Sequence, residues 1–264
     1  MLELKNINKT FYTELGHSKT VFDNLSLIAN KGEFITIIGS NGAGKSTLLN
    51  IINGNVEVDS GSIELNGVDI TNLKPHKRAK WISQVYQDPT LGTSPSMVVL
   101  ENLSMAMNKG KPFNLHFGLD IKHIDYFNEQ LKDLGLGLEK QLYTRVGSLS
   151  GGQRQCLSLL MATLKKPDIL LLDEHTAALD PQTSQIILEK TKEIIEKNNL
   201  IAFMITHNMQ DAIKYGNRLI MFHKGKIIFD IKGEEKENLT VEKLLNLFKQ
   251  KELKLSDLSD KDLF

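Results

Sequence analysis

Residues 39–47 have the composition and spacing of a loop that binds phosphate. Their sequence, GSNGAGKST, fits the pattern G-x-x-x-x-G-K-[ST], with a strand-like run before it and a helical run after it. Glycine lets the backbone lie close to phosphate oxygens, and the N–H groups at the start of a helix favour an anion. We therefore expect a nucleoside triphosphate here. The expected binding residues are Gly39, Ser40, Asn41, Gly42, Ala43, Gly44, Lys45, Ser46 and Thr47.

Two residues of this loop have specific expected tasks. Lys45 would neutralise charge on the β- and γ-phosphates, and the hydroxyl of Ser46 would bind Mg²⁺. The alternative is a glycine-rich turn without a ligand. The complete motif and its flanking elements argue against that alternative.

Two adjacent carboxylates, Asp173 and Glu174, directly follow the apolar run ILLL at 169–172. In P-loop proteins an aspartate that ends a neighbouring apolar strand holds Mg²⁺, so we assign Asp173 to the metal. Where a strand ends, the next side chain can turn toward the γ-phosphate, and Glu174 would there orient or deprotonate the attacking water. The alternative is a solvated strand end without a chemical task.

The segment LSGGQRQ at 149–155 is a second candidate anion site. Ser150 has the residue type of a helix N-cap, and Gly151 and Gly152 would expose N–H groups at the start of the helix that follows. The alternative is a flexible cap. Because the segment lies far along the chain within a helical region, it is difficult to see it serving the phosphate held by residues 39–47.

Strand and helix patterns alternate along most of the chain, and this predicts a mainly parallel sheet flanked by helices. The run at 33–38 has the continuous apolar pattern of a strand buried on both faces, and Asn66-Gly67 between apolar runs predicts a hairpin. Helical spacing without a strand extends over about 92–165. We divide the chain into residues 1–238, which include this helical subdomain, and residues 239–264, an amphipathic helix and tail.

Composition narrows the class of protein. The 264 residues carry 32 Lys+Arg and 32 Asp+Glu, and this balance does not favour nucleic acid as a partner. The single cysteine, Cys156, excludes an internal disulfide and suits a reducing compartment, where we expect it to be a small core residue. We find no secretory leader, and no apolar run long enough for a membrane span. These features predict a soluble, cytoplasmic protein.

The three motifs, in this order, resemble the Walker A, signature and Walker B motifs of the ATP-binding cassette (ABC) family, over about residues 1–232. The resemblance implies an α/β P-loop NTPase fold, with a RecA-like core, an antiparallel β subdomain and an inserted α-helical subdomain. It also implies an ATPase that uses ATP and Mg²⁺. In that family two cassettes enclose two ATP molecules head to tail, so the segment Ser150, Gly151, Gly152 and Gln153 would bind ATP of the facing subunit in a homodimer.

The resemblance implies further site residues. Gln87 looks like the Q-loop glutamine that contacts Mg²⁺ and the γ-phosphate, and His207 looks like the switch histidine at the γ-phosphate. Phe11 is similar in position to the aromatic residue that stacks on adenine, with Tyr12 or a core role for Phe11 as alternatives. Asp180 ends AALD at 177–180, which resembles the D-loop that reaches across the dimer. The expected catalytic set is thus Glu174, His207, Gln87 and Lys45.

The chain departs from the family pattern after the carboxylate pair. The family usually has Pro-Thr-Ser there, whereas this chain has His175, Thr176 and Ala177. A histidine titrates near neutrality and could contact the catalytic glutamate or the dimer partner. The alternative, which we favour because Glu174 and His207 already fill the required roles, is that position 175 only turns the chain.

Several stretches, among them DEHTAALDP at 173–181, are similar to a subgroup of tryptophan/tyrosine importers. This similarity implies an amino-acid importer whose ATPase lies peripherally on the inner face of the cell membrane, bound to a separate integral-membrane permease. An extracytoplasmic solute-binding protein would serve the same system indirectly. An exporter ATPase, a soluble scaffold ATPase of the iron–sulfur type and a degenerate nucleotide-binding regulator are the alternatives.

Overall fold

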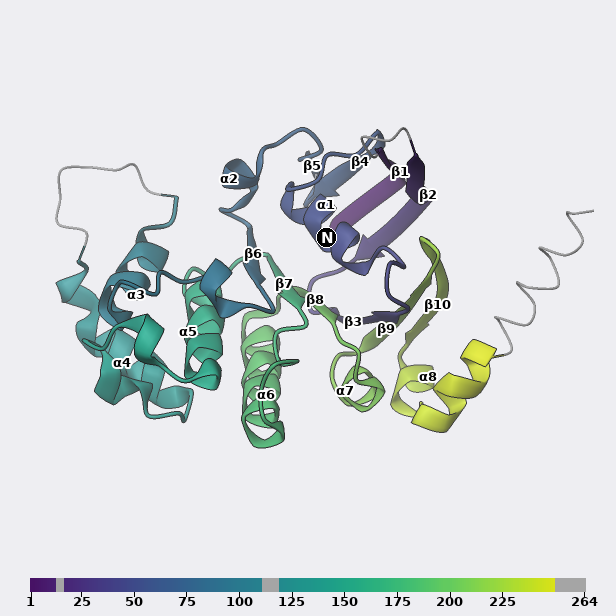
Figure 1. Cartoon of the computed structure of the whole chain (residues 1–264). Helices are drawn as coiled ribbons and strands as arrows, with labels where there is room; N and C mark the ends of the chain where they lie inside the picture. Colours follow the sequence, from purple (N-terminus) through teal and green to yellow (C-terminus); the bar gives the residue numbers. More distant parts are fainter. Residues whose placement is uncertain (13–16, 111–118, 250–264) are drawn as a thin grey trace, which may run out of the picture.

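The computed structural model describes residues 1–12, 17–110 and 119–249. Two sheets form its centre (Figure 1). The smaller sheet is antiparallel and has the strand order β2-β1-β4-β5. Its strands are β1 (Leu2–Tyr12), β2 (Ser18–Ala29), β4 (Ser60–Leu65) and β5 (Val68–Asp69). The predicted hairpin joins β4 to β5, where Asn66 and Gly67 have φ of 50° and 79°, because a two-residue turn of this type requires positive φ at both positions.

The larger sheet has the strand order β10-β9-β3-β8-β7-β6. All neighbouring strands in it are parallel except β10 and β9. Its strands are β3 (Phe34–Gly39), β6 (Ile82–Val85), β7 (Ile169–Asp173), β8 (Ile201–Ile205), β9 (Arg218–His223) and β10 (Lys226–Lys232). The side chains of β3, β7 and β8 are buried almost throughout, as the apolar runs in the sequence predict for parallel strands covered on both faces.

Helices cover both faces of the larger sheet. They are α1 (Lys45–Asn53), α2 (Pro75–Arg78), α3 (Val99–Asn108), α4 (Ile124–Asp133), α5 (Gly151–Thr163), α6 (Pro181–Asn198), α7 (Met209–Lys214) and α8 (Glu234–Glu237). Residues 241–249 are also helical. Within the part of the chain that the structure describes, no helix is long and apolar enough to cross a membrane.

Strand β7 shows how the two faces of the sheet are divided. Ile169 and Leu171 pack into the core cluster that includes α1 and the antiparallel sheet, whereas Leu170 and Leu172 pack into the cluster that includes α3 to α6. Successive strand residues point to opposite faces, so one apolar strand serves both cores. Figure 1 shows α1 above the larger sheet and α5 and α6 below it.

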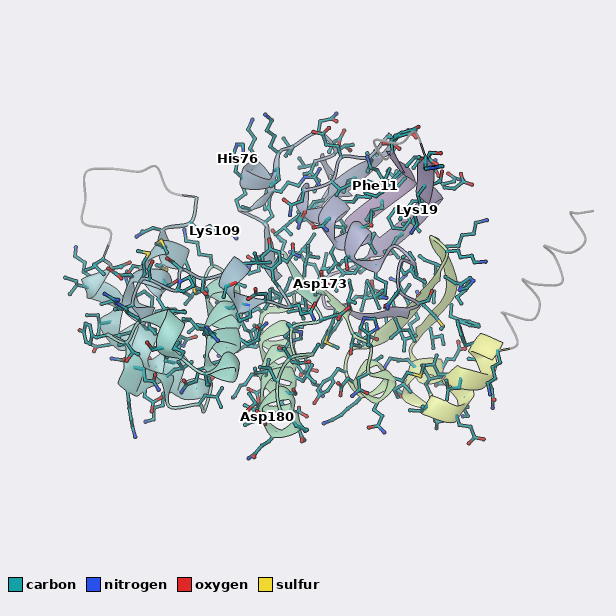
Figure 2. The ribbon with its side chains drawn as sticks, viewed as in Figure 1. Phe11, Lys19, His76, Lys109, Asp173 and Asp180 are labelled. Carbon is teal, nitrogen blue, oxygen red and sulfur yellow. The ribbon has the colours of Figure 1, made fainter. Side chains whose placement is uncertain are left out.

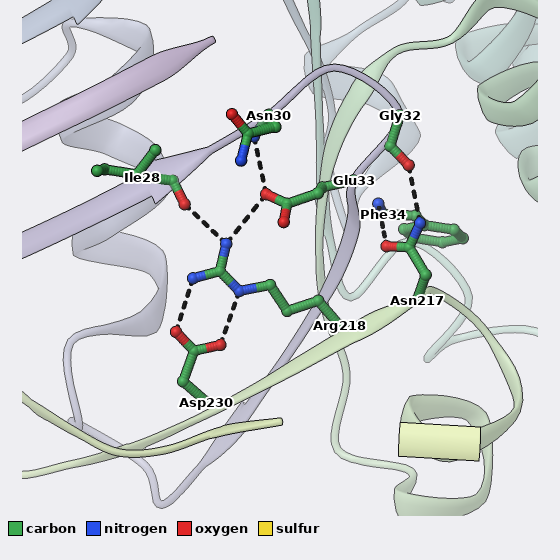
Figure 3. Close-up of polar contacts among 8 residues, drawn as sticks. All are labelled: Ile28, Asn30, Gly32, Glu33, Phe34, Asn217, Arg218 and Asp230. Atoms are coloured by element: carbon green, nitrogen blue, oxygen red, sulfur yellow. Dashed lines mark hydrogen bonds and ion pairs between the residues drawn. The ribbon is translucent and has the colours of Figure 1, made fainter. Parts of the chain in front are cut away.

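A buried arginine joins the two sheets at the end of β3 away from the phosphate-binding loop (Figure 3). Arg218 donates to both oxygens of Asp230, at 2.7 and 2.6 Å, to Glu33 at 3.0 Å and to the carbonyl of Ile28 in β2 at 2.7 Å. Arg218 is only 6% exposed, and two carboxylates with a bidentate contact satisfy its charge. This cluster fixes β2, β9 and β10 to one another and stays clear of the candidate site.

Most of the predicted elements are confirmed, including the helix that ends at Gly54 and the final hairpin at 223–226. The short helix α2 was not expected from the sequence pattern. The predicted strand at 81–87 ends at Val85, so Gln87 lies two residues beyond it. Residues 111–118 of the predicted loop at 108–120, and the tail from 250, lie outside the described residues. The proposed limits of the helical subdomain and of the C-terminal segment remain predictions.

Candidate functional site

A cavity of about 520 Å³ lies at the C-terminal ends of strands β3, β7 and β8. This edge is where parallel α/β sheets bind ligands. The cavity contains most of the expected residues from three separate parts of the chain. Its lining consists of Phe11, Lys19, Val21, Asn41, Gly42, Gly44, Lys45, Ser46, Thr47, Glu174 and His207. We call it the nucleotide cavity.

The phosphate-binding loop has the predicted strand–loop–helix form. Gly44 is the N-cap of α1 with φ of 104°, and a Cβ added there would lie 2.8 Å from the ring of Phe22, so this position requires glycine. The N–H groups of the first turn of α1 thereby face the cavity lined by Lys45, Ser46 and Thr47. An anion in the cavity would interact favourably with this helix end.

Lys45 is 6% exposed, and its Nζ donates to the carbonyl oxygens of Gly39 at 2.8 Å and Ser40 at 3.0 Å. Burial lowers the pKa of its ammonium group, and the charges of Glu174 and Asp173 act in the opposite direction. A polyphosphate would provide the negative charge that this ammonium group otherwise finds only in carbonyl dipoles.

Asp173 and Ser46 meet at the mouth of the cavity. The Oγ of Ser46 lies 3.5 Å from Oδ1 of Asp173. Burial, and secondarily the neighbouring Glu174, raise the pKa of the Asp173 carboxyl group, which shows that an added cation would be electrostatically favourable. A hydroxyl and a single carboxylate are the oxygen donors that Mg²⁺ uses when phosphates and water complete its coordination. In the described residues no group of three or more His, Cys, Asp or Glu side chains is placed to hold a metal, so the phosphates would have to supply ligands.

Glu174 and His207 form the closest polar contact in the cavity. The Nε2 of His207 lies 2.6 Å from Oε1 of Glu174. Glu174 directly follows strand β7 with φ of 48°, a left-handed conformation that costs a non-glycine residue roughly 1–2 kcal/mol. Such strain is typical of functional sites. The reversal turns the Glu174 side chain into the cavity next to the end of β8, where His207 begins the following loop.

Phe11 and Lys19 form the outer wall of the cavity. They are directly paired across strands β1 and β2 (Figure 2), and both are exposed. A Cβ added to Gly42 would lie 3.5 Å from Nζ of Lys19, so the ammonium group reaches over the phosphate-binding loop. Sequence reasoning missed Lys19, because a single exposed lysine in a strand carries no motif. Its register opposite Phe11 is the signal that could have found it.

The signature segment lies away from this cavity, on the other face of the sheet with α5. Ser150 is the predicted N-cap, since its Oγ accepts from the N–H of Gln153 at 3.2 Å and Gln153 Oε1 accepts from the N–H of Ser150 at 3.1 Å. A Cβ on Gly152 would lie 2.3 Å from Thr183, so glycine is needed for the close packing of α5 on α6. The four residues 150–153 therefore cannot contact a nucleotide in this chain's own cavity.

Asp180 and Gln87 also lie outside the nucleotide cavity. Asp180 is the N-cap of α6, where its Oδ1 accepts from the N–H of Thr183 at 2.9 Å, and this hydrogen bond lowers the pKa of the carboxyl group. Gln87 is exposed in the turn after β6. Gln155 of α5 donates to the neighbouring carbonyl of Tyr86 at 3.0 Å, so the turn that carries Gln87 is attached to the signature helix.

His175 does not contact the Glu174 carboxylate. Its side chain is buried, 2% exposed, and its Nε2 lies 3.3 Å from the Oγ1 of Thr191 in α6. Burial lowers the pKa of the imidazole to about 4. Cys156 is buried in α5 as predicted, and burial raises the pKa of its thiol to about 12, so it is an inert core residue.

The class of protein follows from where the strands end. A parallel sheet that presents a phosphate-binding loop beside a carboxylate pair is the arrangement of P-loop nucleoside triphosphatases. Residues 22–177 match the family described as ABC transporter, which is more than half of the chain. The chain therefore belongs to the ABC transporter family, as an ATP-binding subunit that hydrolyses ATP.

Individual relatives agree with this assignment. The chain is 51% identical over 253 residues to the tyrosine transport ATP-binding protein of Clostridioides difficile (strain R20291), across 94% of this chain and 98% of that protein. It is 33% identical over 252 residues to the thiamine import ATP-binding protein ThiQ of Photobacterium profundum, across 92% and 99%. A solved dimeric ATP-binding cassette in a post-hydrolysis state, bound to ADP and Pi, superposes with a TM-score of 0.76 at 27% identity, across 88% and 98%.

Proposed function

We propose that the chain is the ATP-hydrolysing subunit of an importer for tyrosine or a related amino acid, and that it energises a separate integral-membrane permease. The observation that carries this proposal is the 51% identity to a tyrosine transport ATP-binding protein over nearly the whole of both chains. Further relatives named as import ATP-binding proteins, such as the thiamine protein ThiQ, favour import over export. The solute itself would be bound by the permease and an extracytoplasmic binding protein, since the ATPase does not contact it.

Within the nucleotide cavity we assign roles by position. Phe11 would stack on adenine, and the loop 39–47 with Lys45 would hold the phosphates. Glu174 would orient and deprotonate the attacking water. His207 would donate a hydrogen bond to the γ-phosphate as charge develops there. The 2.6 Å contact between His207 and Glu174 supports a paired role for these two side chains at one reacting centre.

Ser46 and Asp173 are the residues we assign to Mg²⁺, and Gln87 would join them from the turn after β6. When bound, the ion would neutralise charge on the β- and γ-phosphates. The support is the oxygen donor set and the pKa of Asp173, which burial raises, because a carboxylate in such surroundings gains from a cation beside it.

We propose that two copies of the chain close around two ATP molecules. Residues 150–153 lie at the start of α5, across the sheet from the nucleotide cavity of their own chain, so they would bind the ATP held by the facing subunit. A second hollow, of about 760 Å³, shares Glu174 and His207 with the nucleotide cavity and extends over Leu179 and Pro181, on either side of Asp180. This continuous surface supports a partner cassette at the same face. ATP binding would close the dimer and hydrolysis would open it.

Two measurements test the import proposal. The tagged chain, purified from membranes in mild detergent, should bring down an integral-membrane permease. Cells that lack the chain should lose uptake of labelled tyrosine, and the wild-type gene should restore uptake whereas the Glu174→Gln variant should not. Recovery of a purely soluble complex would favour the scaffold-ATPase alternative and overturn the proposal. Faster loss of preloaded tyrosine in the presence of the chain would indicate an exporter.

A further inference from the structure

The backbone at Glu174 is held by few contacts of its own. Glu174 has φ of 48°, its N–H donates to the carbonyl of Ile205 at 3.2 Å, and its carbonyl accepts from the N–H of Ala177 at 3.0 Å. A non-glycine residue remains in this conformation only where the surrounding structure determines it strongly. Because the direction of the carboxylate depends on this backbone, whatever fixes the next residue also fixes the carboxylate.

The next residue is a buried anchor. His175 is 2% exposed, and its hydrogen-bond partner Thr191 is fully buried in α6. The hydroxyl of Thr191 has one proton, which it donates to the carbonyl of Ile187 at 2.7 Å. Toward the imidazole the hydroxyl must therefore accept, so Nε2 of His175 carries the proton and donates at 3.3 Å. The contact needs no charge on the ring.

We propose that His175 is a positioning residue for Glu174. The neutral imidazole, inserted between β7 and α6 and bonded to Thr191, fixes the chain directly after Glu174 in the left-handed conformation that aims the carboxylate at His207 and the γ-phosphate. His175 takes no part in the chemistry, since its ring is buried and bonded to α6. The proposal rests on the assignment of Glu174 to the attacking water and is independent of import and of the identity of the solute.

Steady-state ATP hydrolysis by the full-length chain tests this role. His175→Ala should lower kcat about tenfold and leave KM for ATP nearly unchanged, because a small displacement of a catalytic group affects the transition state more than binding. Thr191→Val should lower kcat about threefold through the same contact. His175→Gln carries an amide nitrogen that can reach the same hydroxyl, and it should retain most of kcat.

The double variant and a matched control separate positioning from general loss of packing. His175→Ala combined with Thr191→Val should be no slower than His175→Ala alone, because both changes remove one contact. Thr163→Val in α5 removes a buried hydroxyl that likewise donates to the carbonyl four residues earlier, at 2.8 Å, without a histidine partner. It should leave kcat and KM at wild-type values.

The proposal is overturned if His175→Ala keeps the wild-type kcat, if its loss appears in KM alone, or if the losses of His175→Ala and Thr191→Val multiply. Should His175→Ala fail to fold, Thr191→Val against Thr163→Val decides, and equal rates in these two variants would overturn the proposal. A Glu174→Gln variant assayed beside them keeps the two questions separate. Undiminished hydrolysis in that variant would reject the assignment of Glu174, whatever the result at position 175.

Discussion

The Nε2 of His207 lies 2.6 Å from Oε1 of Glu174, although 33 positions separate the two residues in the chain. The contact exists because β7 and β8 are parallel neighbours in the sheet, paired from Ile169↔Ile201 to Asp173↔Ile205. Both strands deliver their next side chains to the same edge. The imidazole N–H and the carboxylate thus form one hydrogen-bonded pair that faces the phosphate-binding loop.

The first prediction concerns the carboxylate of this pair. Glu174→Gln keeps the size of the side chain and its capacity to bond His207, but it removes the proton acceptor for the attacking water. We expect ATP to bind as in the wild type and turnover to fall by roughly a hundredfold or more. Because hydrolysis opens the dimer, size-exclusion chromatography with ATP should show the variant trapped as a dimer. Wild-type turnover would remove Glu174 from its assigned role.

The second prediction concerns the imidazole. His207→Ala removes a hydrogen-bond donor to the reacting phosphate, and kcat should fall by about a hundredfold. ATP affinity, measured by titration calorimetry, should change far less, since the side chain is about half exposed and the loop residues supply most of the phosphate contacts. A loss confined to ATP affinity would show that His207 acts in binding and not in the transition state.

How far the sequence predicts this site depends on how local each signal is. The loop at 39–47 and the pair Asp173 and Glu174 carry their chemistry in consecutive residues, next to runs whose apolar pattern identifies buried parallel strands. Their common location follows, because such strands end at one edge of the sheet. The bond between His207 and Glu174 does not follow, since it depends on the strand order and on the reversed backbone at Glu174.

The residues that sequence reasoning left open or missed depend on tertiary geometry. Whether His175 faces the cavity or the core is set by the sign of φ at Glu174, which no composition rule reports for a non-glycine residue. Lys19 becomes relevant only through its cross-strand register with Phe11. Asp180 is a different case, because an aspartate followed by proline predicts a helix N-cap, and the sequence alone could have indicated that local role beside the expected one across the dimer.

The third prediction concerns Lys19, whose ammonium group reaches over the phosphate-binding loop. Lys19→Gln should raise KM for ATP about threefold, the effect of a single exposed charge, with little change in kcat. Lys19→Glu should raise KM further, and added salt should reduce both differences because exposed charges are screened. Lys31→Gln, which alters an exposed lysine in the turn before β3, is the matched control. Equal KM values in all four proteins would exclude a role for Lys19 in binding.

The fourth prediction concerns the dependence of stability on pH at the C-terminal end. Lys236 of α8 is 3% exposed, and its Nζ donates to the carbonyl oxygens of Ile213 and Tyr215 at the end of α7, the latter at 3.4 Å. Burial lowers the pKa of its ammonium group from 10.5 to about 8. Between these two values the unfolded chain binds more protons than the folded chain, so this group makes folding more favourable as pH rises from about 8 to 10.5.

Lys236→Met removes that titration. In urea unfolding at pH of about 7.5 and about 9.5, the wild type should gain about 2 kcal/mol relative to Lys236→Met over this interval, since one pKa unit corresponds to about 1.4 kcal/mol. Lys243→Met, at an exposed lysine of the following helix, should show no such relative gain. A constant difference between wild type and Lys236→Met at both pH values would mean that Lys236 remains charged in the folded protein throughout. The carbonyl oxygens at the end of α7 would then stabilise the ammonium group fully against its burial.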